Sequence, residues 1–295
     1  MLITFYGVRG SIAAPGPSTV KYGGNTSCVH VRLDAGRNLI FDAGTGIREL
    51  GNRMVLHDEP LLLLLSHGHW DHIQGYPFFG PIYQPGREIR VCQGVESNAI
   101  ALKAILEQMD GSNFPVHSED LPSRITTVQQ VDEYLNDQTF HTIRKDLNHP
   151  GGGHAYRIEE DRVSIAYITD NELDPPGAPQ TTYDQWVDFC HGVDLLIHDA
   201  QYTESDMPAK HGWGHSLISQ VRQLAVDAQV KNLAMYHHDP ERSDGELDEI
   251  AIESAKYFKS KNSVIGSYIA AEGLTFELKA RKDPKVSTVD LFYRR

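Results

Sequence analysis

The sequence predicts a mixed α/β (α+β) fold, because short apolar runs typical of buried strands alternate with amphipathic helical patterns. Residues 61–65, 163–168 and 193–197 are apolar runs of strand length, and a histidine or aspartate follows each within two residues. Residues 102–109 and 217–228 carry apolar side chains at the spacing of a helix face. A chain of 295 residues has room for one large domain of this kind or two small ones.

Composition and charge limit the functions that fit the chain. Hydrophobic residues make up 40% and charged residues 23%, as in an ordinary globular protein. The formal net charge of −13 disfavours a large nucleic-acid partner, because affinity for a phosphate backbone comes mainly from lysine and arginine. A small anionic substrate stays compatible, since a pair of metal ions can create a local positive site in an acidic protein.

Cysteine usage and the N-terminus favour the cytoplasm. Cys28, Cys92 and Cys190 are few and widely spaced, which argues against a disulfide framework. The chain does not begin with a basic segment and a long apolar run, and no apolar run reaches membrane-spanning length. We therefore expect a cytoplasmic protein that does not enter a membrane.

The first part of the chain reads as short strands joined by turns. Residues 2–5, 28–33 and 38–41 fit strands, which favours an antiparallel entry to a sheet. The last of these runs ends at Asp42. This carboxylate could hold a metal-binding histidine in place through a hydrogen bond, and it could also cap a helix N-terminus.

The most informative stretch follows the apolar run at residues 61–65. It reads His67-x-His69-x-Asp71-His72, with three histidines and one aspartate within six positions. Neutral imidazole and carboxylate groups are preferred ligands of zinc and its neighbours in the transition series. His67 and His69 have the spacing to chelate one ion, and Asp71 with His72 could reach a second ion beside it.

Further candidate ligands follow later in the chain. Asp170 lies two residues after the end of the apolar run at residues 163–168, and a carboxylate there can serve as a cap or as a metal ligand. His149 and His154 flank a glycine run that frees the backbone to turn a side chain inward. A last apolar strand, at residues 232–236, is followed by His237 and His238.

A second polar group precedes the helix expected over residues 217–228. His198 and Asp199 follow the apolar run at residues 193–197. Ser216 is expected to be the N-cap of the helix. His215 would then lie near the positive end of the helix, where an anion is favoured.

These motifs resemble those of a known family. The motif at residues 67–72 resembles the central motif of the metallo-β-lactamase superfamily, and His149 ahead of the strand at 156–158 resembles its third motif. The resemblance implies a four-layer αββα sandwich with a two-metal site at one edge. It spans nearly the whole chain, so we expect a single domain over residues 1–295. The polar and acidic segment at about 96–145 could cover the site.

The resemblance also implies a role for each candidate ligand. His149 is preferred over His154, and His237 over His238. Asp170 would bridge the two metals, which are expected to be zinc, with manganese or iron also compatible. The implied ligands are His67, His69 and His149 for one ion and Asp71, His72 and His237 for the other. Residues expected to orient these ligands or to contact the substrate are Asp42, His198, Asp199 and His238.

Two elements point to one branch of the superfamily. His198-Asp199-Ala200 and Gly214-His215-Ser216 resemble the His-Glu-Ala and Gly-His-Ser elements of ribonuclease Z. The same elements occur in the phosphodiesterase of the phosphonate-degradation operon and in hydrolases of cyclic nucleotides. The resemblance implies hydrolysis of a phosphodiester by a metal-activated hydroxide, with His215 facing the scissile phosphate and Asp71 orienting the water. Ribonuclease Z has a glutamate where this chain has Asp199. The interaction of Asp199 with His215 is therefore expected to differ from the one in ribonuclease Z.

The expected substrate is a small phosphodiester, with cyclic nucleotides among the candidates. A transfer-RNA 3′-processing endonuclease is the first alternative, but the interval from Asp170 to His198 has no room for the long basic arm that ribonuclease Z carries. Hydrolysis of a thioester or lactone is the second alternative, and His215 would then have no role in the reaction. Most relatives are dimers, so we expect a homodimer.

Overall fold

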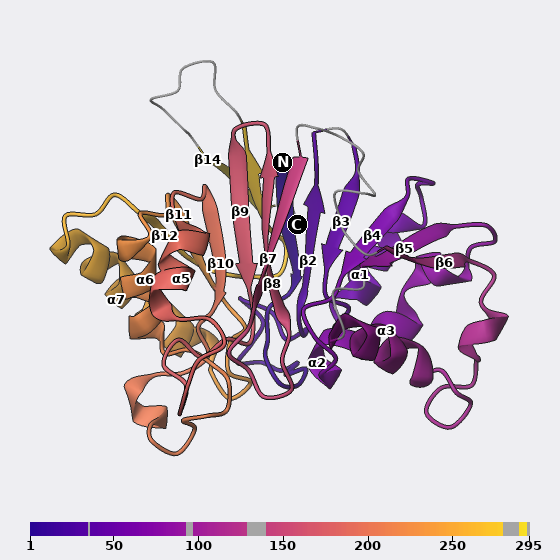
Figure 1. The fold of residues 1–295 in the computed structure, drawn as a ribbon, viewed down its shortest axis with the longest axis horizontal. Helices are drawn as coiled ribbons and strands as arrows, with labels where there is room; N and C mark the ends of the chain where they lie inside the picture. Colours follow the sequence, from indigo (N-terminus) through magenta and orange to yellow (C-terminus); the bar gives the residue numbers. More distant parts are fainter. Residues whose placement is uncertain (35, 93–96, 129–139, 280–288, 294–295) are drawn as a thin grey trace.

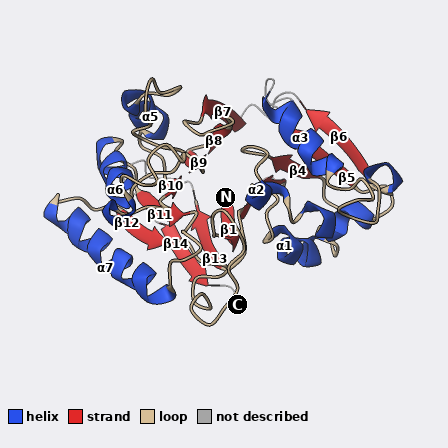
Figure 2. Cartoon of the chain, turned by 90° about the horizontal axis from the view of Figure 1, so that it is seen from below, coloured by secondary structure: helices blue, strands red, loops and turns tan. Residues whose placement is uncertain are grey.

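Two β-sheets form the centre of the molecule, and helices lie on their outer faces (Figure 1). The computed structural model describes residues 1–34, 36–92, 97–128, 140–279 and 289–293. Helices α1 and α3 lie beside one sheet, and α5, α6 and α7 lie beside the other (Figure 2). This arrangement is the αββα sandwich that the sequence predicted. A single domain over the whole chain stays a prediction.

The first sheet begins with antiparallel strands and continues with parallel ones. Its first three strands in the chain pair antiparallel, as expected, and the following strands β4, β5 and β6 join in parallel. The order across the sheet is β14 (Val289–Tyr293), β13 (Leu274–Leu278), β1 (Leu2–Gly7), β2 (Cys28–Arg32), β3 (Asn38–Phe41), β4 (Leu61–Leu64), β5 (Glu88–Cys92) and β6 (Arg124–Val128).

The second sheet is built from the C-terminal half of the chain. Strands β9 to β12 are parallel neighbours, and β7, β8 and β9 form an antiparallel meander at one side. The order across the sheet is β12 (Gly266–Ile269), β11 (Asn232–Tyr236), β10 (Leu195–Asp199), β9 (Val163–Ile168), β8 (His154–Glu160) and β7 (Phe140–Asp146).

Aromatic side chains pack between the two sheets. Phe41 of β3 stacks on Tyr167 of β9 with ring centroids 4.8 Å apart, and Phe5 of β1 lies 5.8 Å from Tyr236 of β11. All four side chains are fully buried, and rings of this size contribute much of the apolar area that drives folding. The core therefore holds the sheets together near the strand ends that carry the polar residues.

Two of the helices, α5 and α7, begin at a residue whose side chain caps the helix. Ser243 accepts a hydrogen bond from the Glu246 backbone at the start of α7, and the Glu246 side chain accepts one from the Ser243 backbone. Such a capping box satisfies two N–H groups that a helix start leaves unpaired. The helices are α1 (Ile47–Met54), α2 (Trp70–Ile73), α3 (Ser97–Glu107), α5 (Tyr183–Cys190), α6 (Ile218–Asp227) and α7 (Asp244–Ser260), with 3₁₀ turns at Tyr76–Phe78, Gly80–Tyr83, Ser118–Asp120 and Glu204–Asp206.

The expected N-cap of the helix at residues 217–228 was wrong. The N-cap position of α6 belongs to Leu217, one residue later than predicted. The Ser216 hydroxyl instead donates to the carbonyl of Asn171 and accepts from the backbone N–H of Leu173. These two bonds hold the Ser216 hydroxyl on the loop that follows β9, and it makes no capping bond to any described residue of α6.

Part of the expected cover segment is described. Residue 96 and residues 129–139 lie outside the described residues. The described parts form α3, which packs beside α2, together with β6 and the start of β7. The proposal that this segment covers the site stays a prediction. Within the described part of the chain, no helix combines the length and apolar character needed to cross a lipid bilayer.

Parallel strands bring the polar residues to one edge of the sandwich. Strands β3 and β4 end side by side in one sheet, and β9, β10 and β11 do so in the other. The residues that follow them gather near α2, at the lower edge in Figure 1. This edge carries the candidate site, because the carboxyl ends of parallel strands commonly meet at such a crevice.

Candidate metal centre

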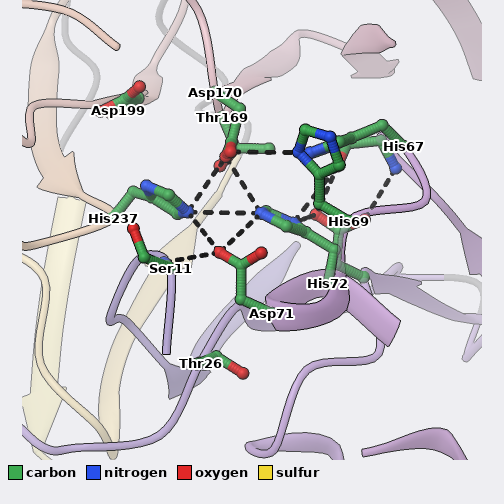
Figure 3. A network of polar contacts seen from close by, with 12 residues as sticks. Ser11, Thr26, His67, His69, Asp71, His72, Thr169, Asp170, Asp199 and His237 are labelled. Carbon is green, nitrogen blue, oxygen red and sulfur yellow. Dashed lines mark hydrogen bonds and ion pairs between the residues drawn. The ribbon is translucent and has the colours of Figure 1, made fainter. Parts of the chain in front are cut away.

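The site is built around the turn that follows β4. His67 and His69 lie in this turn, and Asp71 and His72 lie in the single turn of helix α2. Because the helix begins directly after the turn, the side chains of these four residues face the same small volume. Figure 3 shows Asp71, His72, Asp170 and His237 pointing toward one another.

One cluster consists of His67, His69, His149 and Asp170. The Nε2 atom of His149 lies 3.0 Å from Nδ1 of His69. Oxygen Oδ2 of Asp170 lies 3.6 Å from Nε2 of His67 and 3.7 Å from Nε2 of His149. His69 is exposed while His67 is buried, so this cluster is open to solvent on its His69 side.

The second cluster consists of Asp71, His72, Asp170 and His237, and all four are buried. The Nε2 atom of His237 lies 3.1 Å from Asp71 Oδ2 and 3.1 Å from Asp170 Oδ1. His72 Nε2 lies 3.0 Å from the same Asp170 oxygen. Asp170 thus directs Oδ1 toward one cluster and Oδ2 toward the other, which is the arrangement a bridging carboxylate needs.

Neighbouring groups fix the orientation of these imidazoles. The Asp42 carboxylate accepts hydrogen bonds from His72 Nδ1, at 2.8 Å, and from the hydroxyls of Ser66 and Tyr167. It orients a histidine, and it does not cap a helix. Gln201 Oε1 accepts from His237 Nδ1 at 2.8 Å. Hydrogen bonds of this kind hold the remaining ring nitrogen toward a metal.

No role was predicted from the sequence for Ser66, Gln201 or Gly214. The Gly214 carbonyl accepts a hydrogen bond of 3.0 Å from His149 Nδ1. The Ser66 hydroxyl lies 3.0 Å from His67 Nδ1. Gln201 directly follows the His198-Asp199-Ala200 element, which was a usable signal. Gly214 belongs to the Gly214-His215-Ser216 element, but no spacing in the sequence indicates that its carbonyl or the Ser66 hydroxyl contacts a histidine.

Several groups of the clusters have the protonation states that bind divalent cations. Burial lowers the pKa of His67 well below its usual value, and it lowers the pKa of His149 to about 4. Burial would raise the pKa of Asp170, but the imidazoles of His237 and His72 outweigh burial and hold this pKa well below its usual range. Neutral imidazoles and an ionised carboxylate are the forms that bind metals. His72 is the exception: burial lowers its pKa, but the carboxylates of Asp170, Asp71 and Asp42 outweigh burial and hold this pKa well above its usual value, so a cation would replace the proton.

An unpartnered atom gives a further test of the fit. His67 Nε2 is buried and has no hydrogen-bond partner among the described residues. A buried nitrogen without a partner costs folding free energy, unless a ligand satisfies it. The donor atoms of each cluster lie within 4.8 Å of one another. The residues present therefore fit a pair of cations that share Asp170.

His215 forms a separate pair with Asp199 beside the clusters. Its Nδ1 lies 2.9 Å from Asp199 Oδ2, and its ring stacks on His237 with centroids 5.2 Å apart. Burial lowers the pKa of His215, but the charge of Asp199 and the hydrogen bond to it outweigh burial and raise the pKa to about 9. The imidazole therefore carries a proton at neutral pH.

The remaining candidate histidines point elsewhere. His238 Nε2 donates to the carbonyl of Ala270 at 2.8 Å, so the fold turns His237 and not His238 toward the clusters. His154 Nδ1 lies 3.0 Å from Asp146. His198 is fully buried, and its Nδ1 donates to the Asp199 carbonyl at 2.6 Å. His198 can thus steady the backbone of the residue that pairs with His215.

Comparison with known families identifies the class of protein. A family model described as a beta-lactamase superfamily domain matches residues 37–238. The chain therefore belongs to the β-lactamase superfamily, which confirms the predicted family and the predicted fold. With the two histidine and aspartate clusters, membership makes the chain a metal-dependent hydrolase.

Among curated relatives, the chain is similar to ribonuclease Z proteins. It is 26% identical to ribonuclease Z of Brevibacillus brevis over 305 aligned positions, which cover 88% of this chain and 92% of that protein. It is 24% identical to ribonuclease Z of Thermoplasma acidophilum over 178 positions, which cover 58% of this chain and 52% of that protein. The match thus spans about half the length of the Thermoplasma protein.

Solved structures share the fold. A diphosphatase from the PhnP family has a TM-score of 0.65 at 19% identity, over 94% of this chain and 98% of that chain. Zn²⁺-bound PqqB from Methylobacterium extorquens has a TM-score of 0.67 at 16% identity, over 94% of this chain and 100% of that chain. At these identities the likeness shows a common architecture.

Proposed function

We propose that the protein hydrolyses small phosphodiesters, cyclic nucleotides among them, with two divalent cations. The proposed ligands are His67, His69 and His149 at one ion, and Asp71, His72 and His237 at the other, with Asp170 shared by both. Zinc is the expected metal, and a zinc-bound structural neighbour supports this choice. Manganese and iron also suit this set of nitrogen and oxygen ligands.

The observation that carries the proposal is the pair of His215 and Asp199. A leaving alkoxide is a poor leaving group unless it receives a proton as the phosphorus–oxygen bond breaks. His215 is protonated at neutral pH, and Asp199 holds its Nδ1, so the proton on Nε2 is the one available for transfer. Thioester hydrolysis would make little use of this acid, because a thiolate leaves readily without a proton.

The other residues bind and orient. Asp71 is held by the backbone N–H of Ser11, which donates to its Oδ2 at 2.7 Å. The same Oδ2 lies 3.1 Å from His237 Nε2, so this bond holds in place the carboxylate that we propose orients the attacking water. Two bound divalent cations would supply Lewis acidity for the displacement at phosphorus. Asp42 and Gln201 keep His72 and His237 in the orientation that such ions need.

Cleavage of RNA is the second candidate. The ribonuclease Z relatives favour it, since the similarity to the Brevibacillus protein extends over most of both chains. The net charge of −13 disfavours it, because a folded RNA needs a cationic surface. We therefore rank a small phosphodiester above transfer RNA.

The test uses the purified full chain with added Zn²⁺ or Mn²⁺. The substrates are bis(p-nitrophenyl) phosphate, a panel of cyclic and linear nucleotides, an acyl thioester and an unprocessed transfer RNA. We expect turnover of the small diesters and little of the others. Turnover of the thioester alone would refute the proposal, and efficient cleavage of the transfer RNA alone would favour the second candidate. Size-exclusion chromatography of the same sample tests the expected homodimer.

A further inference from the structure

A cavity of about 220 Å³ opens beside His215. It lies between the loop that follows β9, the turn near residues 207–211 and the start of α6. Its wall has an apolar part and a polar part. The apolar part comes from Met207, Pro208 and Leu217, and the polar part comes from Glu172, Asp174, His211, His215 and Gln220.

We propose that this cavity receives the leaving group of the phosphodiester, and that the leaving group is an uncharged, ring-sized group with hydrogen-bond donors. Sugars belong to this class, and so do nucleosides that place one of their rings in the cavity. The inference rests on the proposed function, and it narrows the substrate to diesters whose leaving side carries no further phosphate.

The position of His215 indicates that the cavity lies on the leaving-group side of the substrate. Its Nδ1 is bonded to Asp199, so a proton is donated from Nε2. Among the described residues no hydrogen bond to this Nε2 is found, and the ring lines the cavity. The atom that receives the proton belongs to the departing group, so that group must lie beside His215. His215 lines this cavity, and its ring also lies 5.2 Å from the ring of His237, so it contacts both the cavity and the metal-ligand cluster.

The volume matches a single ring. A water molecule in the liquid takes about 30 Å³, so the cavity would hold roughly seven waters. One sugar or one base needs a space of this order, whereas pockets for whole drug-sized ligands begin near about 300 Å³. The apolar side chains of Met207 and Leu217 can cover one face of such a ring, and the amide of Gln220 lies on the polar side.

The charges in the cavity exclude a further phosphate. Its lining contains two carboxylates, on Glu172 and Asp174, and no lysine or arginine. The nearby Lys210 already pairs with Asp206 at 3.1 Å and with Asp239 at 2.9 Å. The charge of His215 is already paired with Asp199, so a phosphate that entered here would meet the two carboxylates without a free counterion in the lining. Hydroxyl or amino groups would instead find acceptors on the exposed carboxylate of Asp174.

Glu172 lines the cavity and also binds the loop that carries His215. It is buried, and its two oxygens accept hydrogen bonds from the backbone N–H groups of Gly212, at 2.8 Å, and Gly214, at 3.0 Å. The N–H groups hold its charge in place but only partly neutralise it. Asp174 is therefore the carboxylate whose charge can be removed without loosening the loop that carries His215.

The kinetic test compares three substrates of the metal-loaded full chain. They are a dinucleoside monophosphate and the same compound with a terminal phosphate at one end or at the other. Product analysis shows which nucleoside leaves. We expect a phosphate on the leaving nucleoside to lower kcat/KM about tenfold or more, and a phosphate on the other nucleoside to have a smaller effect. An unchanged or raised kcat/KM with phosphate on the leaving side would overturn the inference.

A charge variant tests the cause of this discrimination. Asp174→Asn should reduce the penalty for the terminal phosphate about threefold, since an exposed charge is partly screened. The matched control is Asp161→Asn, which removes one negative charge from the exposed turn between β8 and β9. The control should leave the penalty unchanged. An equal response of both variants would mean that net charge, and not the cavity, sets the preference.

A binding measurement separates the cavity from the reaction. Saturation-transfer NMR with adenosine and the full chain should detect binding in the wild type. Met207→Trp fills the cavity and should abolish the signal, whereas Ile252→Trp at an exposed site on α7 should retain it. If Met207→Trp abolishes adenosine binding but the wild type cleaves no phosphodiester, the proposed function is wrong and the cavity is still a binding site for a ring-sized group. If Met207→Trp binds adenosine normally, the cavity assignment fails whatever the activity.

Discussion

Three residues of the site share an unusual backbone conformation. Asp42 and His237 each follow a strand directly, and Asp170 follows β9 after one intervening residue. The φ angles of Asp42, Asp170 and His237 are 59°, 47° and 59°. A left-handed conformation costs a non-glycine residue of the order of 1–3 kcal/mol, and it persists where the surroundings hold it. Here it turns each side chain from the strand direction into the site. At His237 it also turns the next residue, His238, away toward Ala270.

The first prediction concerns His215. His215→Ala should retain its metal content but lose about 10²- to 10⁴-fold in kcat on diesters with alcohol leaving groups, because the proton donor is gone. The loss in kcat should be smaller for a p-nitrophenyl diester, because p-nitrophenolate leaves without taking up a proton. Metal analysis and steady-state kinetics measure both effects, with the exposed His191→Ala as the control. Full turnover of alcohol diesters by His215→Ala would show that its assigned role is wrong.

The second prediction concerns pH and His30, a buried residue of β2 whose Nε2 lies 2.9 Å from Asn38 Oδ1. Burial lowers the pKa of His30 to about 4. Below the unfolded pKa of about 6.5, the unfolded chain takes up a proton that the folded chain does not. The contribution of His30 to the free energy of unfolding is therefore complete above pH 6.5 and is lost as the pH falls toward 4.

This loss can be measured by denaturant unfolding at pH 7.5 and pH 5.0. Between these values the free energy of unfolding should fall by about 2 kcal/mol less in His30→Gln than in the wild type. Other groups that titrate do so in both proteins, so the difference isolates His30. Identical decreases in the two proteins would contradict the buried neutral state of His30.

At the scale of elements, the third prediction concerns the loop between η4 (Glu204–Asp206) and α6. Glu172 binds two N–H groups of this loop, at Gly212 and Gly214, whose φ angles are 86° and 87°. Glu172→Gln keeps only one carbonyl oxygen, so one buried N–H faces an amide N–H. The free energy of unfolding should fall by about 1–3 kcal/mol. The rate kcat should fall about 10- to 100-fold, since His215 follows Gly214 directly and loses its position.

Unfolding curves and kinetics check this prediction, with the exposed Glu241→Gln as the matched control. A second readout separates positioning from general damage: the pH profile of kcat should change in Glu172→Gln and stay unchanged in the control. If Glu172→Gln kept both wild-type stability and wild-type kcat, the loop would hold its shape without this carboxylate.

The sequence predicted the elements better than it predicted the loops between them. Buried strands such as β4 and β9 are visible in the sequence as apolar runs. The polar residues that come after these runs could therefore be predicted as candidate ligands. The hydrogen bonds of Gln201 and Glu172 connect residues more than 30 positions apart, so no local pattern contains them. The N-cap prediction at Ser216 failed for the same reason, because its partner Asn171 lies 45 residues away.

At the scale of the whole molecule, the candidate metal centre joins the two sheets. His67, His69, Asp71 and His72 follow β4 of the first sheet, while Asp170 and His237 follow β9 and β11 of the second. Bound ions would therefore connect residues that the unfolded chain keeps far apart. A ligand that binds only the folded chain raises the free energy of unfolding, by about 2.7 kcal/mol at a hundred times its Kd.

The fourth prediction follows from this connection. Removal of metal with a chelator should lower the Tm of the wild type by roughly 5–10 °C, and added Zn²⁺ should restore it. His67→Ala should lose metal and activity, and its Tm should respond little to the chelator. His191→Ala should respond as the wild type does. If metal analysis showed that the ions had left the wild type while its Tm stayed the same, the two clusters would not tie the sheets together through a metal.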